Sequence, residues 1–517
     1  MTAPTTAPYR SGLQPGRDGF AQLLRAEWTK FRTVRGWVIG MIIAALVTVG
    51  IALLDHSSCG SAVTPGGNSA PGCSSPVGPG GEAVTDSFYF VHRPLTGNGS
   101  LSVRVTSLTG PPSGSHARPV LAPWSKAGVI IEATTRPGSA YAAMMITAGH
   151  GVRMQYNYTG DIAGRAGAVS AASPRWLRLT RSGDTLTGYQ SADGKHWSMV
   201  AAVHLAGRPA TVQAGLFAAS PGSAQSTSQS VSGSSETGSI TPATAVFDHV
   251  RLRGQQPSGA WTGDAVGGSG GTAGSGFRRS GTAISVTGSG DIAPDVPAAG
   301  GGGFTVGHTL LGAVAGLIAA LVVAAMFMTA EYRRGLIRVT LTASPRRGRV
   351  LAAKAVVIGS GTFIAGLAGA SAAAALGERL LRSNGNVVLP VGPLTDLRVV
   401  AGTAALLALA AVTALALGVL LRNSALVVTV AIATIVLPYV LATTVLPAAL
   451  ADWLLRLTPA AAFAIQLTLP QYPQVSASYT PANGYFPLAP WAGFAVLCGY
   501  AALALGLAVI SLRRRDA

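Results

Sequence analysis

Residues 306–349 read VGHTLLGAVAGLIAALVVAAMFMTA followed by EYRRGLIRVTLTASPRRGR. The first part, 306–330, contains no Asp, Glu, Lys or Arg, and a transmembrane helix needs about 20 predominantly apolar residues. The second part, 331–349, contains six arginines. Arginine and lysine accumulate in the short loops that face the cytoplasm. This stretch therefore predicts a membrane span that ends in a cytoplasmic loop.

The rest of the chain has a similarly apolar composition. Of its 517 residues, 49% are hydrophobic and only 11% are charged, whereas a soluble protein has about 25% charged residues. We predict a multi-pass α-helical membrane protein with about six spans. Lys354 is the only charged residue of the third span, and we expect its ammonium group to reach the cytoplasmic interface. Besides 306–330, the predicted spans are 37–54, 350–376, 399–421, 425–446 with a kink at Pro438, and 491–512.

The basic residues predict how these spans are oriented. They occur in 1–36, in 331–349, at Arg422 and in the tail 513–517, and all four places lie on the same side if the N-terminus is cytoplasmic. Both termini are then cytoplasmic in a plasma membrane protein, and 55–305 is extracellular. The net charge of +18 thus indicates the lipid bilayer as a partner, and we expect no nucleic acid.

Two apolar segments allow a second interpretation. Residues 454–469 are short and contain Arg456, so we expect an interfacial or re-entrant helix within the external loop 447–490. A seventh span at this place would leave the basic tail outside. Residues 37–54 are predicted to be an uncleaved span. The alternative is a signal peptide, but no A-x-A cleavage site follows promptly.

The segment that precedes the first span predicts an amphipathic helix in the cytoplasmic interface. Charged residues recur on one side of this helix, namely Arg25, Glu27, Lys30 and Arg32. The apolar side consists of Phe20, Leu23, Leu24, Trp28 and Phe31.

The long external segment predicts an all-β domain between two linkers. Residues 85–254 contain short alternating runs such as Leu101-Ser-Val103-Arg-Val105, separated by turns such as Ser182-Gly-Asp184. Gly/Ser-rich stretches at 55–84 and 255–305 are predicted to be flexible linkers. The expected fold is therefore a jelly-roll β-sandwich inserted between spans 1 and 2.

Three stretches of this segment, 124–131, 178–197 and 246–250, read WSKAGVII, RLTRSGDTLTGYQSADGKHW and VFDHV. They resemble the concanavalin-like, laminin-G-like jelly-roll family. The resemblance implies a two-sheet module that often binds glycans. Trp124, Tyr156, Tyr158 and Trp197 are the candidate ligand contacts, and the alternative is that these aromatic rings fill the core.

No enzyme chemistry is expected in the chain. A glycosidase needs two carboxylates that face one cleft, and the candidates Glu132 and Asp161 are well separated in the sequence. We predict no metal site. Cys59 and Cys73 would form a disulfide in an oxidising exterior, and the alternative is two free thiols.

The membrane parts carry a second resemblance. Residues 25–35, RAEWTKFRTVR, together with 331–341 and 345–349, resemble permease subunits of type-2 ABC (ATP-binding cassette) exporters in the actinobacterial style. The resemblance implies a homodimer or a pair with a second permease, and a separate ATPase subunit that holds ATP and Mg²⁺. The residues that would couple to this ATPase are Glu331, Tyr332, Arg333, Arg334, Gly335, Arg338, Arg346, Arg347 and Arg349.

The chain itself has no G-x-x-x-x-G-K-[ST] phosphate-binding sequence, so ATP hydrolysis would belong to that partner. The alternative role of the arginines is to fix the topology and to contact anionic lipid. Two other functions stay open: a membrane-anchored glycan-binding or sensory protein without transport, and a tethered glycosidase. This chain departs from the family plan in one respect. The first external loop is normally short in the family, whereas here it would be the long segment 55–305.

Overall fold

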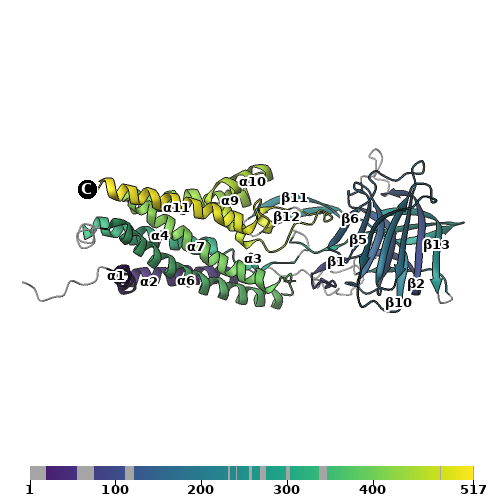
Figure 1. Ribbon diagram of the computed structural model, residues 1–517, viewed down its shortest axis with the longest axis horizontal. Helices are drawn as coiled ribbons and strands as arrows, with labels where there is room; N and C mark the ends of the chain where they lie inside the picture. The colour runs from purple at the N-terminus through teal and green to yellow at the C-terminus, as the bar shows by residue number, and fades with distance from the viewer. Residues whose placement is uncertain are drawn as a thin grey trace, which may run out of the picture.

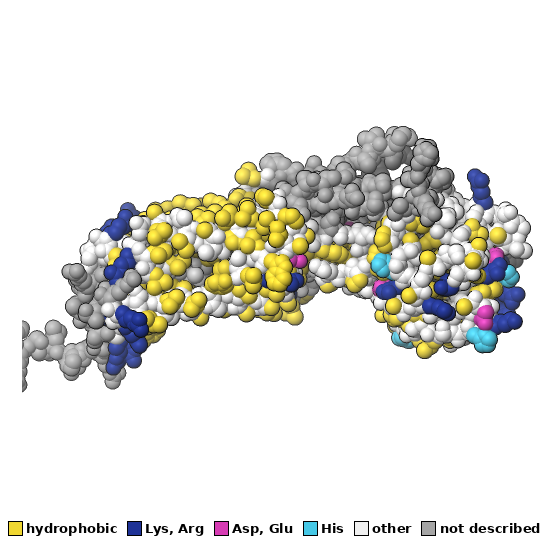
Figure 2. Space-filling model, turned by 90° about the horizontal axis from the view of Figure 1, so that it is seen from above, with side chains coloured by type: hydrophobic (Ala, Val, Ile, Leu, Met, Phe, Trp, Pro, Cys, Tyr) yellow, Lys and Arg dark blue, Asp and Glu magenta, His cyan; other side chains and the backbone are white. Residues whose placement is uncertain are grey.

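The computed structural model describes residues 19–54, 75–110, 121–230, 233–239, 241–255, 259–267, 275–297, 303–336, 346–477 and 479–515. These residues form an elongated molecule with a helical bundle at one end and a β-domain at the other (Figure 1). The basic side chains of the bundle gather at the end that lies away from the β-domain, and its flank is covered by hydrophobic side chains (Figure 2).

The described residues contain six helical segments that are long and apolar enough to cross a membrane, which confirms the predicted number. The fifth of these segments is built from three consecutive pieces, α8, η1 and α9. The segments are α2 (Arg35–Leu53), α4 (Ala313–Arg333), α6 (Arg347–Ser383), α7 (Pro393–Leu421), α8 (Ser424–Ala431) with η1 (Ile432–Val436) and α9 (Leu437–Thr444), and α11 (Pro490–Arg515).

Three of these spans differ by more than three residues from their predicted bounds. The fourth begins at Pro393, before the predicted start at 399. The second begins with a separate short helix, α3 (Val306–Thr309), before α4 starts at Ala313. The third continues to Ser383, beyond the predicted end at 376, because its last turns are polar and are supported by an ion pair of 3.0 Å between Arg382 and Glu378. The π-helix η1 ends two residues before Pro438, the position of the predicted kink.

The segment between α9 and α11 contains a sharply bent helix pair. α10 (Ala448–Leu457) and η2 (Pro459–Gln466) meet at 105°. All residues of η2 are buried, and the ring of Phe463 stacks on Tyr439 at a centroid distance of 4.0 Å. This geometry fits a re-entrant loop or a broken span, the two alternatives for 454–469.

The β-domain is a sandwich of two sheets that share one long strand, β2 (Phe88–Thr109). Its first half, up to Thr96, pairs with β10 and β14, and its second half, from Gly99, pairs with β13 and β7. The first sheet contains β14 (Thr262–Val266), β2, β10 (Thr211–Ala219), β3 (Lys126–Glu132), β4 (Tyr141–Thr147), β5 (Gly151–Tyr156) and β6 (Gly160–Ala163). The second contains β15 (Gly276–Ser280), β16 (Ala283–Gly288), β13 (Ala243–Gln255), β2, β7 (Arg175–Ser182), β8 (Thr185–Ser191) and β9 (Ser198–His204).

Alternation along the strands produces the core between these sheets. Leu101, Val103 and Val105 are fully buried in it, whereas Ser102 and Arg104 between them point to the other side. The domain is therefore an all-β jelly roll, as its turns and alternation predict. A separate two-stranded ribbon of β11 (Ser223–Ser230) and β12 (Gly233–Ser239) lies outside the two sheets and contacts α9 and the short helix η3 (Pro481–Asn483).

The prediction that 255–305 is a flexible linker throughout is wrong, because β14, β15, β16 and β17 (Ile292–Pro294) lie in it. The sandwich thus extends beyond the predicted bound at 254. Ile284 and Val286 are buried in its core, on either side of the polar Ser285. The glycines serve turns: Gly281 between β15 and β16 has a φ of +60°, a conformation that glycine adopts without strain.

The outer face of the first sheet is covered by the chain itself. β1 (Val84–Asp86) pairs with β17, and both lie over a second apolar cluster that includes Phe88, Ile130 and Phe217. Lys126, which is fully buried, fixes this cover. Its Nζ donates to the Ile292 carbonyl at 2.9 Å and pairs with Asp291 at 2.6 Å.

Asp86 lies at the end of this cover in a buried position. Its Oδ2 accepts hydrogen bonds from the Tyr158 hydroxyl at 2.7 Å and from the Gly138 amide at 2.8 Å. Burial raises the pKa of Asp86 from 3.8 to about 6, although these two bonds and the charge of Lys126 lower it. Burial also raises the pKa of Glu132, and the charge of Asp86 adds to that effect.

We predict that Asp86→Asn removes a pH-dependent loss of stability from the β-domain. The folded-state pKa of Asp86 is raised, so its contribution is fully present below about pH 3.8 and is lost as the pH rises through about 6. The asparagine still accepts the Tyr158 hydrogen bond but does not ionise. Thermal unfolding at several pH values should show the wild type losing up to about 3 kcal/mol relative to the variant at neutral pH. Parallel curves for both proteins would contradict this assignment.

A non-covalent contact also joins the β-domain to the bundle. Gln474, in the segment that leads to α11, is 2% exposed. Its Nε2 donates to the carbonyls of Tyr158 and Thr159 at 3.3 and 3.2 Å. Both acceptors lie in the β5–β6 turn, where Asn157 and Tyr158 have positive φ. This contact fixes the outer side of the first sheet toward the bundle.

Gln474→Ala should loosen this attachment, because the two carbonyls lose their donor while they stay partly buried. The expected result is faster hydrogen–deuterium exchange in peptides that cover 470–485 and in the β5–β6 turn. Gln471→Ala, at an exposed position of the same segment, is the matched control and should exchange like the wild type. Equal exchange in both variants would show that Gln474 does not hold the domain.

Candidate functional site

The candidate site is the end of the bundle that carries the basic residues, where α1 (Phe20–Thr33) packs against the spans. Aromatic rings make the first part of this contact. Phe31 is buried, and its ring centroid lies 6.0 Å from that of Phe327 of α4. The ring centroid of Trp37 lies 4.9 Å from the same Phe327 centroid. The apolar side of α1 is thus fixed to the beginning of α2 and to α4.

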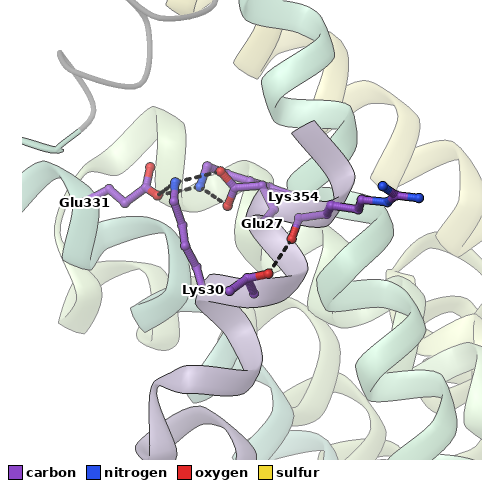
Figure 3. A network of polar contacts seen from close by, with 6 residues as sticks. Glu27, Lys30, Glu331 and Lys354 are labelled. Atoms are coloured by element: carbon purple, nitrogen blue, oxygen red, sulfur yellow. Dashed lines mark hydrogen bonds and ion pairs between the residues drawn. The ribbon is translucent and has the colours of Figure 1, made fainter. Parts of the chain in front are cut away.

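Four charged side chains make the second part, which we call the ion-pair network (Figure 3). Lys354 Nζ of α6 lies 2.7 Å from Glu27 Oε2 of α1 and 2.6 Å from Glu331 Oε1 of α4. Lys30 Nζ of α1 lies 2.8 Å from Glu27 Oε1 and 3.2 Å from Glu331 Oε1. Two cations and two anions from three segments therefore neutralise one another.

Burial makes this network more than a surface contact. The side chains of Glu27 and Lys354 are each 1% exposed and that of Glu331 is 8% exposed, whereas Lys30 is 41% exposed. A buried charge is costly unless it is paired, so each of the three segments depends on the other two. Lys354 also lies over the ring of Phe327, 5.2 Å from its centroid.

Two expectations about these residues are wrong. Lys354 does not extend out of the bundle, because both carboxylates reach it inside. Glu27 and Lys30, which the helical pattern assigns to the polar side of α1, turn toward α4 and α6. A lysine in an apolar run without a partner in its own helix is the signal for such a network.

Of the other residues of the predicted interfacial helix, some pack against the bundle and some are exposed. Leu23 and Leu24 are half-buried, and Phe31 is buried. Phe20 and Trp28 are each 40% exposed. The helix itself is present as predicted, but its packing face is a mixture of apolar and charged residues.

Four of the predicted coupling residues form an exposed basic rim next to the network. Arg333, Arg334, Arg346 and Arg349 are exposed, and Gly335 has a φ of +67° just after α4 ends. Basic side chains gather at one end of the bundle (Figure 2).

Two further coupling residues make internal contacts. Tyr332 lies under the guanidinium of Arg422, 5.0 Å from its ring centroid, and Arg347 donates to the Leu512 carbonyl. Arg338 lies outside the described residues, as do Cys59 and Cys73.

The candidate glycan contacts are not brought together on one face. Trp124 is buried and stacks on His150 at 3.9 Å, and Tyr158 is buried under the cover of the first sheet. Tyr156 packs at the edge of the core between the sheets. Trp197 belongs to the second sheet's side, where Arg178 lies over it.

The two carboxylates weighed for hydrolysis also have separate environments. Asp161 pairs with the Arg153 guanidinium and accepts from Gln155 Nε2 at 3.2 Å. Glu132 is 1% exposed, and neither of its oxygens has a hydrogen-bond partner among the described residues. Within this part of the chain, no group of three His, Cys, Asp or Glu side chains is arranged to hold a metal ion.

Comparison with known proteins adds little to this geometry. No protein-family model and no curated protein matches the chain. The chain is similar to a functionally unknown protein from Saccharomyces cerevisiae, with 16% identity over 34% of this chain and 77% of that one, at a TM-score of 0.20.

Two enzymes also match. The GH43 protein BlXynB from Bacillus licheniformis shares 19% identity over 23% of this chain and 24% of that one, at a TM-score of 0.18. Scytalido-glutamic peptidase shares 8% identity over 39% and 98%, at a TM-score of 0.23. All three scores are too low to carry an argument about fold or activity.

Lys354→Gln should destabilise the bundle by about 3–5 kcal/mol, because Glu27 and Glu331 keep their buried charges without this cation. Lys30→Gln is the matched control. Since Lys30 is 41% exposed, its loss should cost about 1 kcal/mol or less. The measurement is the unfolding midpoint of the helical circular-dichroism signal in detergent. The double variant Glu27→Gln/Lys354→Gln should recover part of the loss, and equal midpoints for the two single variants would refute the role of burial.

Proposed function

We propose that this chain is the membrane-spanning permease subunit of an ABC-type exporter, driven by a separate ATPase subunit that binds the basic rim. The observation that carries the proposal is a direct ion pair between a residue at the start of the segment 331–349 and a residue shortly after its end. Glu331 begins this segment and Lys354 follows it by little more than one helical turn, and their charged groups lie 2.6 Å apart.

This contact supports a coupling role for the segment. A force applied to 331–349 reaches α4 through Glu331 and α6 through Lys354, and it reaches α1 because Glu27 binds the same ammonium group. Three elements of the bundle therefore respond together. A segment that only connected two spans would need no such shared anchor.

The rim supplies the surface on which a partner binds. Arg333 and Arg334 are exposed directly after the network, and Arg346 and Arg349 are exposed where α6 begins. In this proposal, an acidic surface of the ATPase contacts these guanidinium groups, and ATP-driven closure of the partner moves the three anchored elements. ATP and Mg²⁺ are held by the partner, and the permease acts as a homodimer or with a second permease.

The topology of the proposal places both termini and the rim in the cytoplasm and the β-domain outside the cell. The six apolar segments support a membrane location, and the clustering of arginines at one end supports this orientation.

The proposal predicts that the charge-reversed variant Arg333→Glu/Arg334→Glu loses its ATPase. The wild type, purified from its native membrane, should bring with it a subunit with a phosphate-binding G-x-x-x-x-G-K-[ST] sequence, together with ATP hydrolysis. Like-charge contact should reduce the recovered hydrolysis by about tenfold or more.

Arg513→Glu/Arg514→Glu is the matched control, because both arginines are exposed at the C-terminal end of α11. This variant should retain the ATPase. Retention by both variants would exclude the rim as the docking site, and a wild type that copurifies with no such subunit would argue against the transporter function itself.

A further inference from the structure

The outer face of the second sheet carries exposed arginines, whereas that of the first is covered by β1 and β17. Four neighbouring strands place Arg251, Ser102, Arg178 and Tyr189 in one row across this face. Arg253 stands two residues further along β13, next to Ser100 of β2. Small serines thus separate arginines that lie two strands, or about 10 Å, apart.

An aromatic side chain completes the row. The Arg178 guanidinium lies 3.8 Å from the ring centroid of Trp197, and Trp197 Nε1 donates to the Gly194 carbonyl at 3.1 Å. The loop between β8 and β9 is itself fixed, because Asp193 accepts from the amides of Lys195 and His196 at 2.8 Å each. The ring and the guanidinium therefore form a stack that the fixed loop supports.

The charge of this face is not balanced by the protein. Among the described residues, no carboxylate pairs with Arg178, Arg251 or Arg253, whereas the neighbouring Arg104 is bound by Asp248 at 2.5 Å. Burial, and next the like charge of Arg253, lower the pKa of Arg178. Like charges on one sheet face are unfavourable, and an anion that bridges them would relieve this repulsion.

The position of the face matches an extended ligand. Arg251 and Arg253 are exposed, while Arg178, Tyr189 and Trp197 are half-buried. The first sheet turns its outer side to the bundle through Gln474 and the β1–β17 cover, so the second sheet faces away from the bundle (Figure 1). A polymer outside the membrane can therefore reach it without passing the bundle.

We propose that the face formed by Arg178, Arg251, Arg253, Tyr189 and Trp197 binds an anionic polysaccharide. The guanidinium groups bind its carboxylate or phosphate groups, for which the planar fork of arginine is suited. The Trp197 ring offers an apolar surface for a sugar ring. The site goes beyond the proposed transport function and rests on it only for the extracellular location of the ligand.

The test uses the whole protein in nanodiscs of phosphatidylcholine, which carry no net charge and do not compete for the arginines. The probe is fluorescent polygalacturonate, and binding is followed by fluorescence anisotropy. Dextran is the neutral probe, and a single-stranded oligothymidylate of similar charge reports a general affinity for polyanions. We expect polygalacturonate to bind, with an affinity that falls as salt is added, and the other two probes to bind at least tenfold more weakly.

Arg251→Gln/Arg253→Gln should weaken polygalacturonate binding by about tenfold, because charge-assisted hydrogen bonds are lost. Trp197→Leu should weaken it severalfold. Arg136→Gln/Arg165→Gln removes the same charge from two exposed positions in loops of the first sheet and should bind like the wild type. Unchanged thermal unfolding of the β-domain is required of every variant, and Arg251→Lys/Arg253→Lys replaces a variant that fails it.

An equal loss in both glutamine pairs would mean that net charge alone attracts the polymer and would overturn the assigned site. Equal affinity for the oligothymidylate would overturn the polysaccharide as its ligand. Absence of polygalacturonate binding by the wild type would overturn the inference altogether. None of these results bears on the ATPase copurification, so the two proposals fail independently.

Discussion

The ammonium group of Lys354 determines how the basic end of the bundle is assembled. It is held between Glu27 and Glu331 at 2.7 and 2.6 Å, in a place where its side chain is 1% exposed. A lysine so deeply buried needs both anions, since desolvation alone costs several kcal/mol. Consequently α1 is part of the bundle and does not lie free in the interface. The same charge also holds together α4 and α6, the helices on either side of the segment 331–349.

The two outer faces of the β-domain differ in what covers them. The first sheet is covered by β1, β17 and the Asp86–Tyr158 contact, and Gln474 fixes that side toward the bundle. The second sheet leaves Arg251 and Arg253 exposed, next to the half-buried Arg178 and Trp197. A sandwich held on one face presents the other in a constant direction. This arrangement adds an orientation relative to the bundle to a domain that the sequence alone describes only as a jelly roll.

Apolar periodicity predicts the helices and strands well, and the interactions between distant segments poorly. The six spans and the alternation of Leu101, Val103 and Val105 follow from local composition. The strands at 262–294 are missed because glycine and serine dominate their surroundings, and the buried Ile284 and Val286 are a weak signal. The network is missed for another reason. Glu27, Glu331 and Lys354 are far apart in the chain, and each looks like an ordinary interfacial charge until the fold joins them.

The position of the β-domain between two adjacent spans follows from the pairing of its ends. β1 and β17 are antiparallel neighbours, with Val84 opposite Pro294, so the chain enters and leaves the domain at one place. α2 and α4 can then remain in direct contact. A Cβ at Gly312 or Gly316 of the second span would collide with Thr48 of α2, so these helices approach closely. The pair is held at one end by β1 and β17 and at the other by the Phe31, Trp37 and Phe327 rings. An insertion with distant ends would have separated the two spans and, with them, the network that joins α1 to α4.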